Sequence, residues 1–291
     1  MHDTEADPKV PRCNTGRRDF VRRSLGSGFA AAVLPVTAQT QISTDTTGLT
    51  AGEVTIAVGD FRLPTYRAMP AGKSGLPVVL VVSEIFGVHE HIADIARRLA
   101  RQGYFVIAPE LFERHGDPGS YGELGKLMDE VVSQAADAQV MADLDACVAW
   151  AAAQGADTAK LGITGFCWGG RVTWMYAAHN PALKAGVAWY GPVARAYARG
   201  DKTALEVAPR IQAPMLGLYG AADTGIPRDT LERMRVALKA TGNTRSQIVV
   251  YPDTPHAFHA DYRPSYRKKA AQDGWRRCLA WFAAHGVGVV A

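Results

Sequence analysis

The residues best suited to chemistry begin with a cysteine flanked by glycines. Residues 165–170 read Gly-Phe-Cys-Trp-Gly-Gly, so glycine lies two positions before and two positions after Cys167. A nucleophile on a sharp strand-to-helix turn needs this spacing, because the turn leaves no room for a Cβ atom on the flanking residues. A helix that begins here would also stabilise a thiolate. The pattern predicts that Cys167 is a catalytic nucleophile and not a buried cysteine in a glycine-rich turn.

An acid and a histidine follow the cysteine in the order that such a turn predicts. Asp223 lies after the apolar run at residues 215–219, and His256 lies after the run at residues 247–251. The loops that carry such residues gather at one edge of a sheet. We therefore predict a triad in which the thiolate of Cys167 attacks a carbonyl carbon and forms an acyl-enzyme. His256 would protonate the leaving group, and Asp223 would orient the imidazole ring.

The tetrahedral intermediate of this reaction needs two hydrogen-bond donors for its oxyanion. The backbone N–H of Trp168 directly follows the nucleophile and is the first expected donor. The backbone N–H of Ile85 comes after the apolar run at residues 77–83 and is the expected second donor.

The surrounding sequence predicts the elements that would position these residues. Short apolar runs alternate with longer amphipathic stretches, which is typical of a mostly parallel sheet with helices on both faces. In such sheets, ligands bind beyond the carboxyl ends of the strands. We predict a β-hairpin at residues 53–58 and 61–67, strands at 77–83, 104–108, 161–164, 185–190, 215–219 and 247–251, and helices at 91–103, 129–153, 169–178, 228–240 and 266–285.

Two further segments resemble a known family. Residues 83–88, Ser-Glu-Ile-Phe-Gly-Val, are similar to the strand-end motif of the dienelactone hydrolase family, and residues 109–114, Pro-Glu-Leu-Phe-Glu-Arg, are similar to its Pro-Asp-Leu-Tyr segment. With the triad positions, the resemblance covers about residues 53–285. It implies an α/β-hydrolase fold and a hydrolase that acts on small esters or lactones, such as the enol-lactone dienelactone, without a cofactor.

The resemblance also implies roles for individual residues around the cysteine. Glu84 would contact the resting Cys167 and modulate its thiol, because a nearby carboxylate disfavours the thiolate; a strand-end glutamate in an ion pair is the alternative. Family members hold the substrate carboxylate with two arginines, and Arg114 is at the position of the first. The second would lie four residues after His256, where this chain has Ala260.

Other side chains near these motifs leave alternatives open. Arg263 could turn inward to replace the missing arginine, or it could cap a surface loop. Phe86 is expected to form an aromatic wall for the substrate, although it could equally be an ordinary core residue. His259 is expected to line the rim of the site. His89 and His91 lack a third ligand at a useful spacing, so no metal site is predicted.

The N-terminal residues predict a targeting signal. Paired arginines at residues 17–18 precede a short apolar stretch that ends in small residues near Ala38, and this resembles a twin-arginine export signal. The stretch is too short to span a bilayer. We predict a signal peptide at residues 1–38 that engages the twin-arginine export machinery, a flexible lead-in at 39–51 and one α/β-hydrolase domain at 52–291, located in the periplasm and not in the membrane.

Composition argues against some other functions. The net charge of +4 owes much to the arginines of the predicted signal, and no Lys- and Arg-rich run is interleaved with aromatic residues, so nucleic acid is not an expected partner. Cys147 and Cys278 fit the apolar faces of helices, and no Cys-x-x-Cys pair supports a redox role. The alternative to an esterase or lactonase is a protein that keeps the fold and binds a small molecule without turnover.

Overall fold

The computed structural model describes residues 42–289, which form an eight-stranded sheet covered by helices. The strands follow one another across the sheet in the order β1-β2-β4-β3-β5-β6-β7-β8. β1 and β2 form the predicted hairpin, β2 pairs with β4 in the antiparallel sense, and every later pairing is parallel. The strands are β1 (Leu49–Val58), β2 (Phe61–Pro70), β3 (Pro77–Val82), β4 (Phe105–Pro109), β5 (Asp157–Phe166), β6 (Ala185–Trp189), β7 (Met215–Gly220) and β8 (Gln247–Tyr251).

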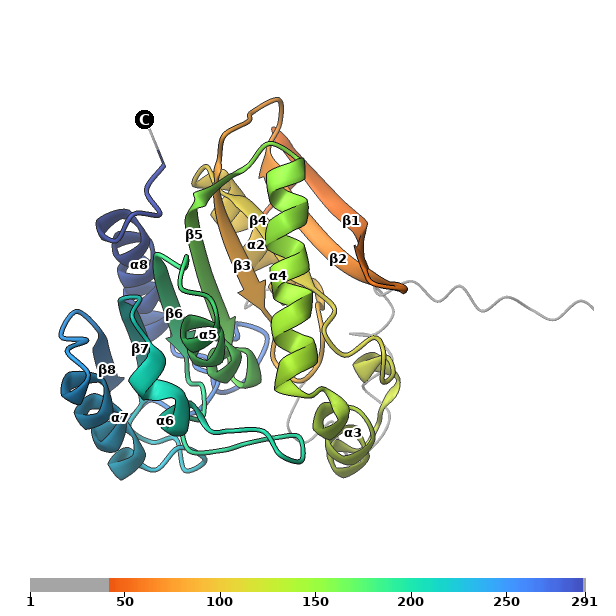
Figure 1. Ribbon diagram of the computed structural model, residues 1–291. Coiled ribbons are helices and arrows are strands. Elements are labelled where there is room, and N and C mark those ends of the chain that lie inside the picture. The colour runs from red at the N-terminus through yellow and green to blue at the C-terminus, as the bar shows by residue number, and fades with distance from the viewer. Residues whose placement is uncertain (1–41, 290–291) are drawn as a thin grey trace, which may run out of the picture.

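Helices cover the sheet on both faces, as the alternating sequence pattern predicts (Figure 1). α2 and α8 pack on one face, and α4 and α5 pack on the other. The α-helices are α2 (Glu90–Arg101), α3 (Leu124–Glu130), α4 (Asp137–Ala153), α5 (Trp168–His179), α6 (Ala204–Val207), α7 (Arg228–Ala240) and α8 (Lys268–Ala284). Three 3₁₀ turns join them, η3 (Pro118–Ser120), η4 (Val132–Gln134) and η5 (Ala208–Arg210). This is the predicted α/β-hydrolase architecture, and it confirms the mostly parallel sheet.

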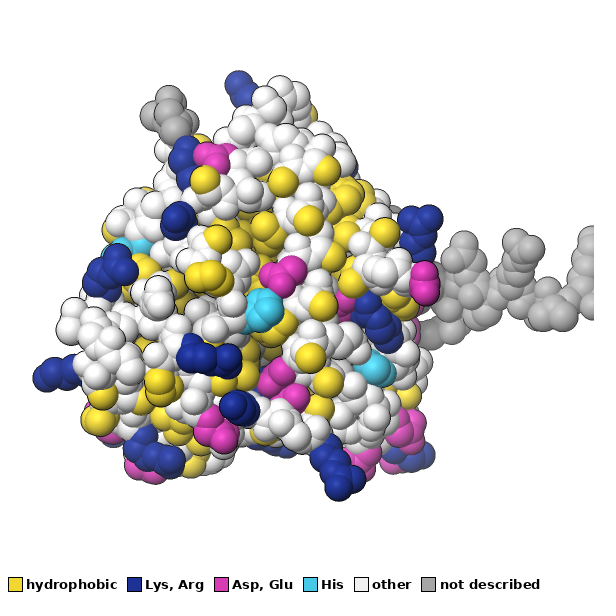
Figure 2. All heavy atoms as spheres, viewed as in Figure 1, with side chains coloured by type: hydrophobic (Ala, Val, Ile, Leu, Met, Phe, Trp, Pro, Cys, Tyr) yellow, Lys and Arg dark blue, Asp and Glu magenta, His cyan; other side chains and the backbone are white. Residues whose placement is uncertain are grey.

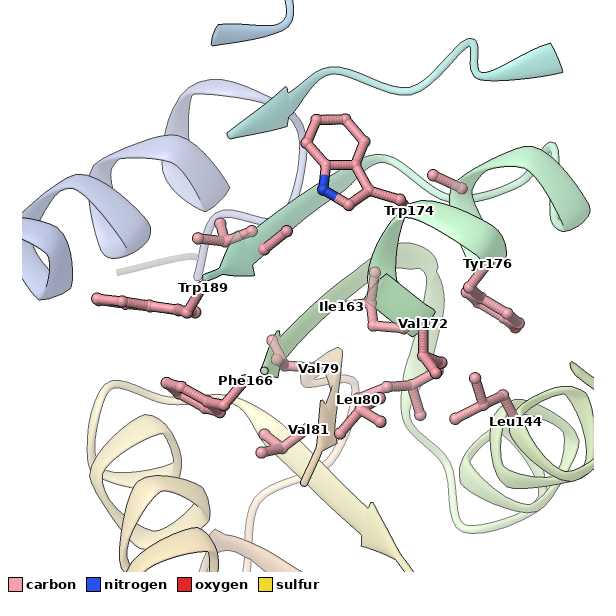
Figure 3. Close-up of a cluster of buried hydrophobic side chains, with 14 of the residues drawn as sticks. Val79, Leu80, Val81, Leu144, Ile163, Phe166, Val172, Trp174, Tyr176 and Trp189 are labelled. Carbon is pink, nitrogen blue, oxygen red and sulfur yellow. The ribbon is translucent and has the colours of Figure 1, made fainter. Parts of the chain in front are cut away.

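The core explains why the central strands are almost wholly apolar. Side chains alternate along β3, so that Leu80 lies on the side of α4 while Val81 lies on the opposite side (Figure 3). Phe166 and Trp189 continue the layer on the side of Val81, with ring centroids 5.5 Å apart. A strand that is buried on both faces needs apolar residues at every position, and β3 is fully buried along its length.

The region predicted as one helix over residues 129–153 is divided in the structure. α3 ends at Glu130, η4 follows, and α4 begins only at Asp137. Val131 and Val132 are fully buried, and the Ser133 hydroxyl donates to the carbonyl oxygen of Asp129. Burial of the two β-branched residues and a side-chain hydrogen bond that competes with the helix both favour a break here. The prediction of a single long helix was therefore wrong.

Regular structure begins slightly earlier than predicted. β1 starts at Leu49, three residues before the predicted domain start at Gly52. Part of the predicted lead-in is tethered, since the backbone N–H of Ile42 donates to Asp261 at 2.9 Å and that of Thr44 donates to Asp94 at 2.5 Å. The predicted signal peptide lies outside the described residues.

The visible surface carries charges of both signs. Figure 2 shows that, on this face, acidic and basic side chains are scattered among apolar ones and do not gather into a basic stripe. Among residues 42–289, no helix combines the length and the apolar character that crossing a membrane requires.

Candidate active site

The turn that carries Cys167 joins β5 to α5 at the carboxyl edge of the sheet. Cys167 is the N-cap of α5 and has a left-handed backbone, with φ 54° and ψ −114°. Its backbone N–H donates to the Trp189 carbonyl at 3.0 Å, which fixes the turn against β6. A Cβ atom on Gly165 would collide with the Gly169 carbonyl, and one on Gly169 would collide with the Val82 carbonyl. The glycines on both sides of the cysteine are therefore a steric requirement of this turn.

The structure brings His256 and Asp223 to the same edge. His256 Nδ1 lies 2.6 Å from Asp223 Oδ2, and the imidazole lies near enough to Cys167 for that residue to influence its pKa. Burial lowers the pKa of His256, but the charge of the Cys167 thiolate and the hydrogen bond to Asp223 outweigh it and raise the pKa to about 10. Cys167, His256 and Asp223 thus lie together at one edge of the sheet, and their roles as nucleophile, base and orienting acid stay predictions.

The positions expected to supply the oxyanion donors are close together. Trp168 is the first residue of α5, so its backbone N–H is among those without an acceptor inside the helix. Ile85 follows the end of β3, and the Ser83 carbonyl lies only 2.5 Å from where a Cβ of Gly169 would be. The end of β3 therefore packs directly on the start of α5. The role of the two N–H groups in binding an oxyanion stays a prediction.

Glu84 is buried beside this turn, but His89 is its hydrogen-bond partner. Its Oε2 lies 3.0 Å from His89 Nε2, while its Oε1 is buried and forms no hydrogen bond. Burial raises the pKa of Glu84, but the hydrogen bond and charge of His89, with smaller effects from Arg263 and His91, lower it to about 2. The contact with His89 therefore fits the alternative stated above, in which Glu84 is a strand-end glutamate in an ion pair.

Arg263 turns inward, which decides between the two orientations left open by the sequence. Its guanidinium carbon lies 4.8 Å from the centroid of the Phe86 ring and 5.1 Å from that of Tyr262. Burial lowers the pKa of Arg263, but Tyr262, Glu84 and Cys167 raise it well above its usual range. Arg263 and Phe86 therefore lie together in a partly buried cluster near Cys167.

Arg114 is held by a carboxylate of the protein itself. Its two Nη atoms lie 2.5 and 2.7 Å from the Asp143 oxygens, and its guanidinium stacks 4.0 Å from the Phe61 ring centroid. Asp143 is completely buried. A bidentate pair of this kind is strong and geometrically specific. In this structure the charge of Arg114 is therefore already paired with Asp143.

Two tyrosines near the triad were missed by the sequence reasoning. Tyr190 directly follows β6, has φ 39°, and lies edge-on to His256 with ring centroids 5.0 Å apart. Its hydroxyl is buried without a hydrogen-bond partner, and burial, with Glu84 nearby, raises its pKa. Tyr262 has its hydroxyl 3.4 Å from His89 Nε2. The position of Tyr190 at a strand end was the one signal that could have identified it.

His259 was expected to line the rim of the site, but it lies in an aromatic cluster. It is 3% exposed, and its ring centroid is 4.5 Å from that of Trp189 and 5.3 Å from that of Phe166. His91 pairs with Asp261 at 3.0 Å. Across residues 42–289, no three metal-ligating side chains are arranged to hold a metal ion.

The two other described cysteines lie in the core without a disulfide. Both Cys147 and Cys278 are fully buried, as predicted. Burial raises the pKa of Cys147, and it raises that of Cys278 to about 12. Cys167 is partly exposed.

Comparison with known proteins decides the family. The model of the dienelactone hydrolase family matches residues 63–286, which contain Cys167, Asp223 and His256. The chain belongs to the dienelactone hydrolase family. It is also 58% identical over 287 residues to a protein of Methylorubrum extorquens that is provisionally named a carboxymethylenebutenolidase, with 98% of each chain covered.

Solved structures agree with this assignment. The crystal structure of a protein from Klebsiella pneumoniae, provisionally named a dienelactone hydrolase, is 54% identical, has a TM-score of 0.78, and covers 81% of this chain and 98% of its own. A dienelactone hydrolase-like phosphotriesterase from metagenomic libraries, 24% identical with a TM-score of 0.68 over 82% of this chain and 99% of its own, shares the fold. This family member is thus a hydrolase of the carboxymethylenebutenolidase type.

Proposed function

We propose that this protein hydrolyses a small ester or lactone through a thioester formed on Cys167. The observation that carries the proposal is the position of the His256 ring, which pairs with Asp223 at 2.6 Å and lies near enough to Cys167 for that residue to raise its pKa. A thiol at a helix N-terminus beside an imidazole is set up to ionise and attack a carbonyl carbon.

The proposed reaction has two halves. The Cys167 sulfur attacks the carbonyl carbon, and the N–H groups of Ile85 and Trp168 stabilise the oxyanion. The tetrahedral intermediate collapses to the thioester as the leaving oxygen takes a proton from His256. Water then attacks the thioester carbon, gives a proton to His256 and releases the acid. Asp223 keeps the imidazole in the required tautomer throughout.

The substrate class that we propose is taken from the relatives of this chain. Relatives are named for carboxymethylenebutenolide, an enol-lactone, and we propose a related small ester or lactone for this chain. Phe86 and Arg263 would contact it, since both lie in the partly buried cluster near Cys167. With Ala260 at the second arginine position and Arg114 paired to Asp143, a substrate carboxylate would have to rely on Arg263.

Replacing Cys167 by alanine tests this function. We expect hydrolysis of p-nitrophenyl acetate and of a panel of lactones and methyl esters, dienelactone included, to fall by at least about 10³-fold, because the nucleophile is gone while the fold is kept. The matched control is Cys278→Ala, since that thiol is buried. Wild-type levels of turnover in Cys167→Ala would disprove the nucleophile, and absence of turnover in the wild-type protein across the panel would favour a binding protein without catalysis.

A further inference from the structure

The part of the chain that carries His256 has no regular secondary structure of its own. Residues 252–267 join β8 to α8 through turns, and we call them the β8–α8 segment. Backbone hydrogen bonds close these turns, such as the bond from the Ala260 N–H to the Ala257 carbonyl at 3.0 Å. Such bonds fix the local path of a connecting segment but not its place against the sheet. The place of the imidazole ring therefore also depends on side chains that anchor the segment to its neighbours.

Asp261 anchors the β8–α8 segment to α2. It is 1% exposed, and its Oδ1 lies 3.0 Å from His91 Nδ1. Its Oδ2 accepts from Arg98 Nη2 at 3.2 Å and from the backbone N–H of Ile42 at 2.9 Å. Burial raises the pKa of Asp261, but the hydrogen bond and charge of His91, with Ile42 and Arg98, lower it below its usual range. An ionised carboxylate thus joins three parts of the chain, namely the lead-in, α2 and the β8–α8 segment.

This contact lies against the end of the strand that leads to the nucleophile. Phe166 ends β5 and directly precedes Cys167. The rings of His91 and His259 have their centroids 6.3 and 5.3 Å from that of Phe166, and they are 5.7 Å from each other. The pairing of Asp261 with His91 therefore holds the β8–α8 segment and α2 together beside the end of β5.

The lead-in reinforces this contact. Besides the bond from Ile42, the backbone N–H of Thr44 donates to Asp94 of α2 at 2.5 Å. Asp94 also accepts from Arg98 at 2.5 Å, and the same arginine bonds to Asp261. The lead-in comes before the residues that the family model matches. Its support of the β8–α8 segment is thus a feature of this chain that membership of the family does not predict.

We propose that Asp261 is a positioning residue for the proposed reaction, and that with His91 and the Ile42 N–H it holds the β8–α8 segment so that the His256 ring stays at Asp223. Asp261 does not touch the substrate and acts only through the segment. The inference rests on the proposed function, because it assigns a support to the base of that reaction. Since a displacement of about 1 Å can cost about 10²-fold in rate, a loosened segment should be visible in kcat.

Asp261→Asn tests this role, because it keeps the size of the side chain and removes its charge and one acceptor oxygen. In the full-length protein we expect kcat for p-nitrophenyl acetate to fall about tenfold, with KM within about twofold of the wild-type value, since Asp261 does not reach the ester. Dividing kcat by the amplitude of the first p-nitrophenol burst excludes unfolded molecules. Amide hydrogen exchange of residues 254–263 should become faster, while that of residues 161–170 stays unchanged.

Three further variants isolate the contacts of Asp261. His91→Phe removes the donor and keeps a ring against Phe166, and combining it with Asp261→Asn should cost no more than the larger single change, because both act through one contact. Ile42→Pro removes one backbone donor and should lower kcat by about twofold, whereas its matched control Ile42→Ala keeps that donor. Asp45→Asn is the control for the carboxylate, since Asp45 lies exposed on the lead-in and pairs with Arg101.

Two results would overturn the inference. One is a wild-type kcat per burst site in Asp261→Asn, even with a lower unfolding temperature, because Asp261 would then support stability alone. The other is unchanged hydrogen exchange of residues 254–263 in that variant. If the wild-type protein released no p-nitrophenol, the proposed function would fail instead, and hydrogen exchange would still decide whether Asp261 holds the segment.

Discussion

His256 and His259 lie three residues apart on one segment, yet their surroundings are opposite. His256 has its side chain 35% exposed and is bonded to Asp223 at 2.6 Å, with a pKa raised to about 10. His259 is packed among aromatic rings, its Nδ1 has no partner, and burial is the main reason that its pKa is lowered. The same side chain is thus held for protonation by a carboxylate in one place and packed as a neutral ring among aromatic residues in the other.

The difference shows that the partner, and not the residue type, decides what a histidine does here. A carboxylate beside a ring favours the charged form and fixes the tautomer, whereas burial without a carboxylate favours the neutral form. Asp261 is close in sequence to both histidines, but it bonds to His91 and to the backbone of Ile42. It therefore leaves His259 neutral.

Of the two histidines, His256 should give the stronger loss of activity when it is replaced, as in His256→Asn. We predict a loss of turnover of roughly 10⁴-fold or more, because the thiol loses its base and the leaving group loses its acid. The free energy of unfolding should change by less than about 1 kcal/mol, since the side chain is partly exposed. Ester hydrolysis and urea unfolding measure the two quantities. A variant with nearly full turnover would remove His256 from the reaction.

The smaller effect is expected from His259→Phe. Turnover should stay within a fewfold of the wild-type rate, because the ring only fills the aromatic cluster. The lowered pKa of His259 means that the unfolded state binds more protons below about pH 6.5, so the wild-type protein loses stability as the pH falls. We predict that His259→Phe gains stability relative to the wild-type protein by up to about 1.4 kcal/mol per pH unit below that point.

Urea unfolding at several pH values tests this second variant. A stability difference that does not change with pH would show that His259 is protonated in the folded protein. A loss of turnover as large as that of His256→Asn would show that the two histidines had been assigned the wrong way round.

Much of the fold could be predicted because its signals are local. β7, β8 and α7 occur within a residue of the ranges expected from apolar periodicity. The glycines around Cys167 identified the turn, because no other residue fits there. Strand order then placed Asp223 and His256 at the same edge. The prediction of one helix over residues 129–153 failed because the chain breaks at the buried residues Val131 and Val132, and periodicity alone does not show this break.

The contacts that the sequence did not predict are side-chain pairs between distant elements. Arg114 looked free for a substrate until the structure showed it bound to Asp143 on α4. The orientation of Arg263 and the pairing of Glu84 with His89 likewise depend on how loops pack, for which no motif exists. Sequence reasoning therefore found the residues of the candidate site more readily than their partners.

Trapping of the acyl-enzyme shows which side chain is the nucleophile. Wild-type protein mixed with p-nitrophenyl acetate and quenched in acid within the first turnovers should carry one acetyl group, and peptide mapping should place it on Cys167. The buried Cys147 and Cys278 serve as internal controls in the same digest. An acetyl group on another residue, or continued turnover with no covalent intermediate at any quench time, would contradict a nucleophilic role for Cys167.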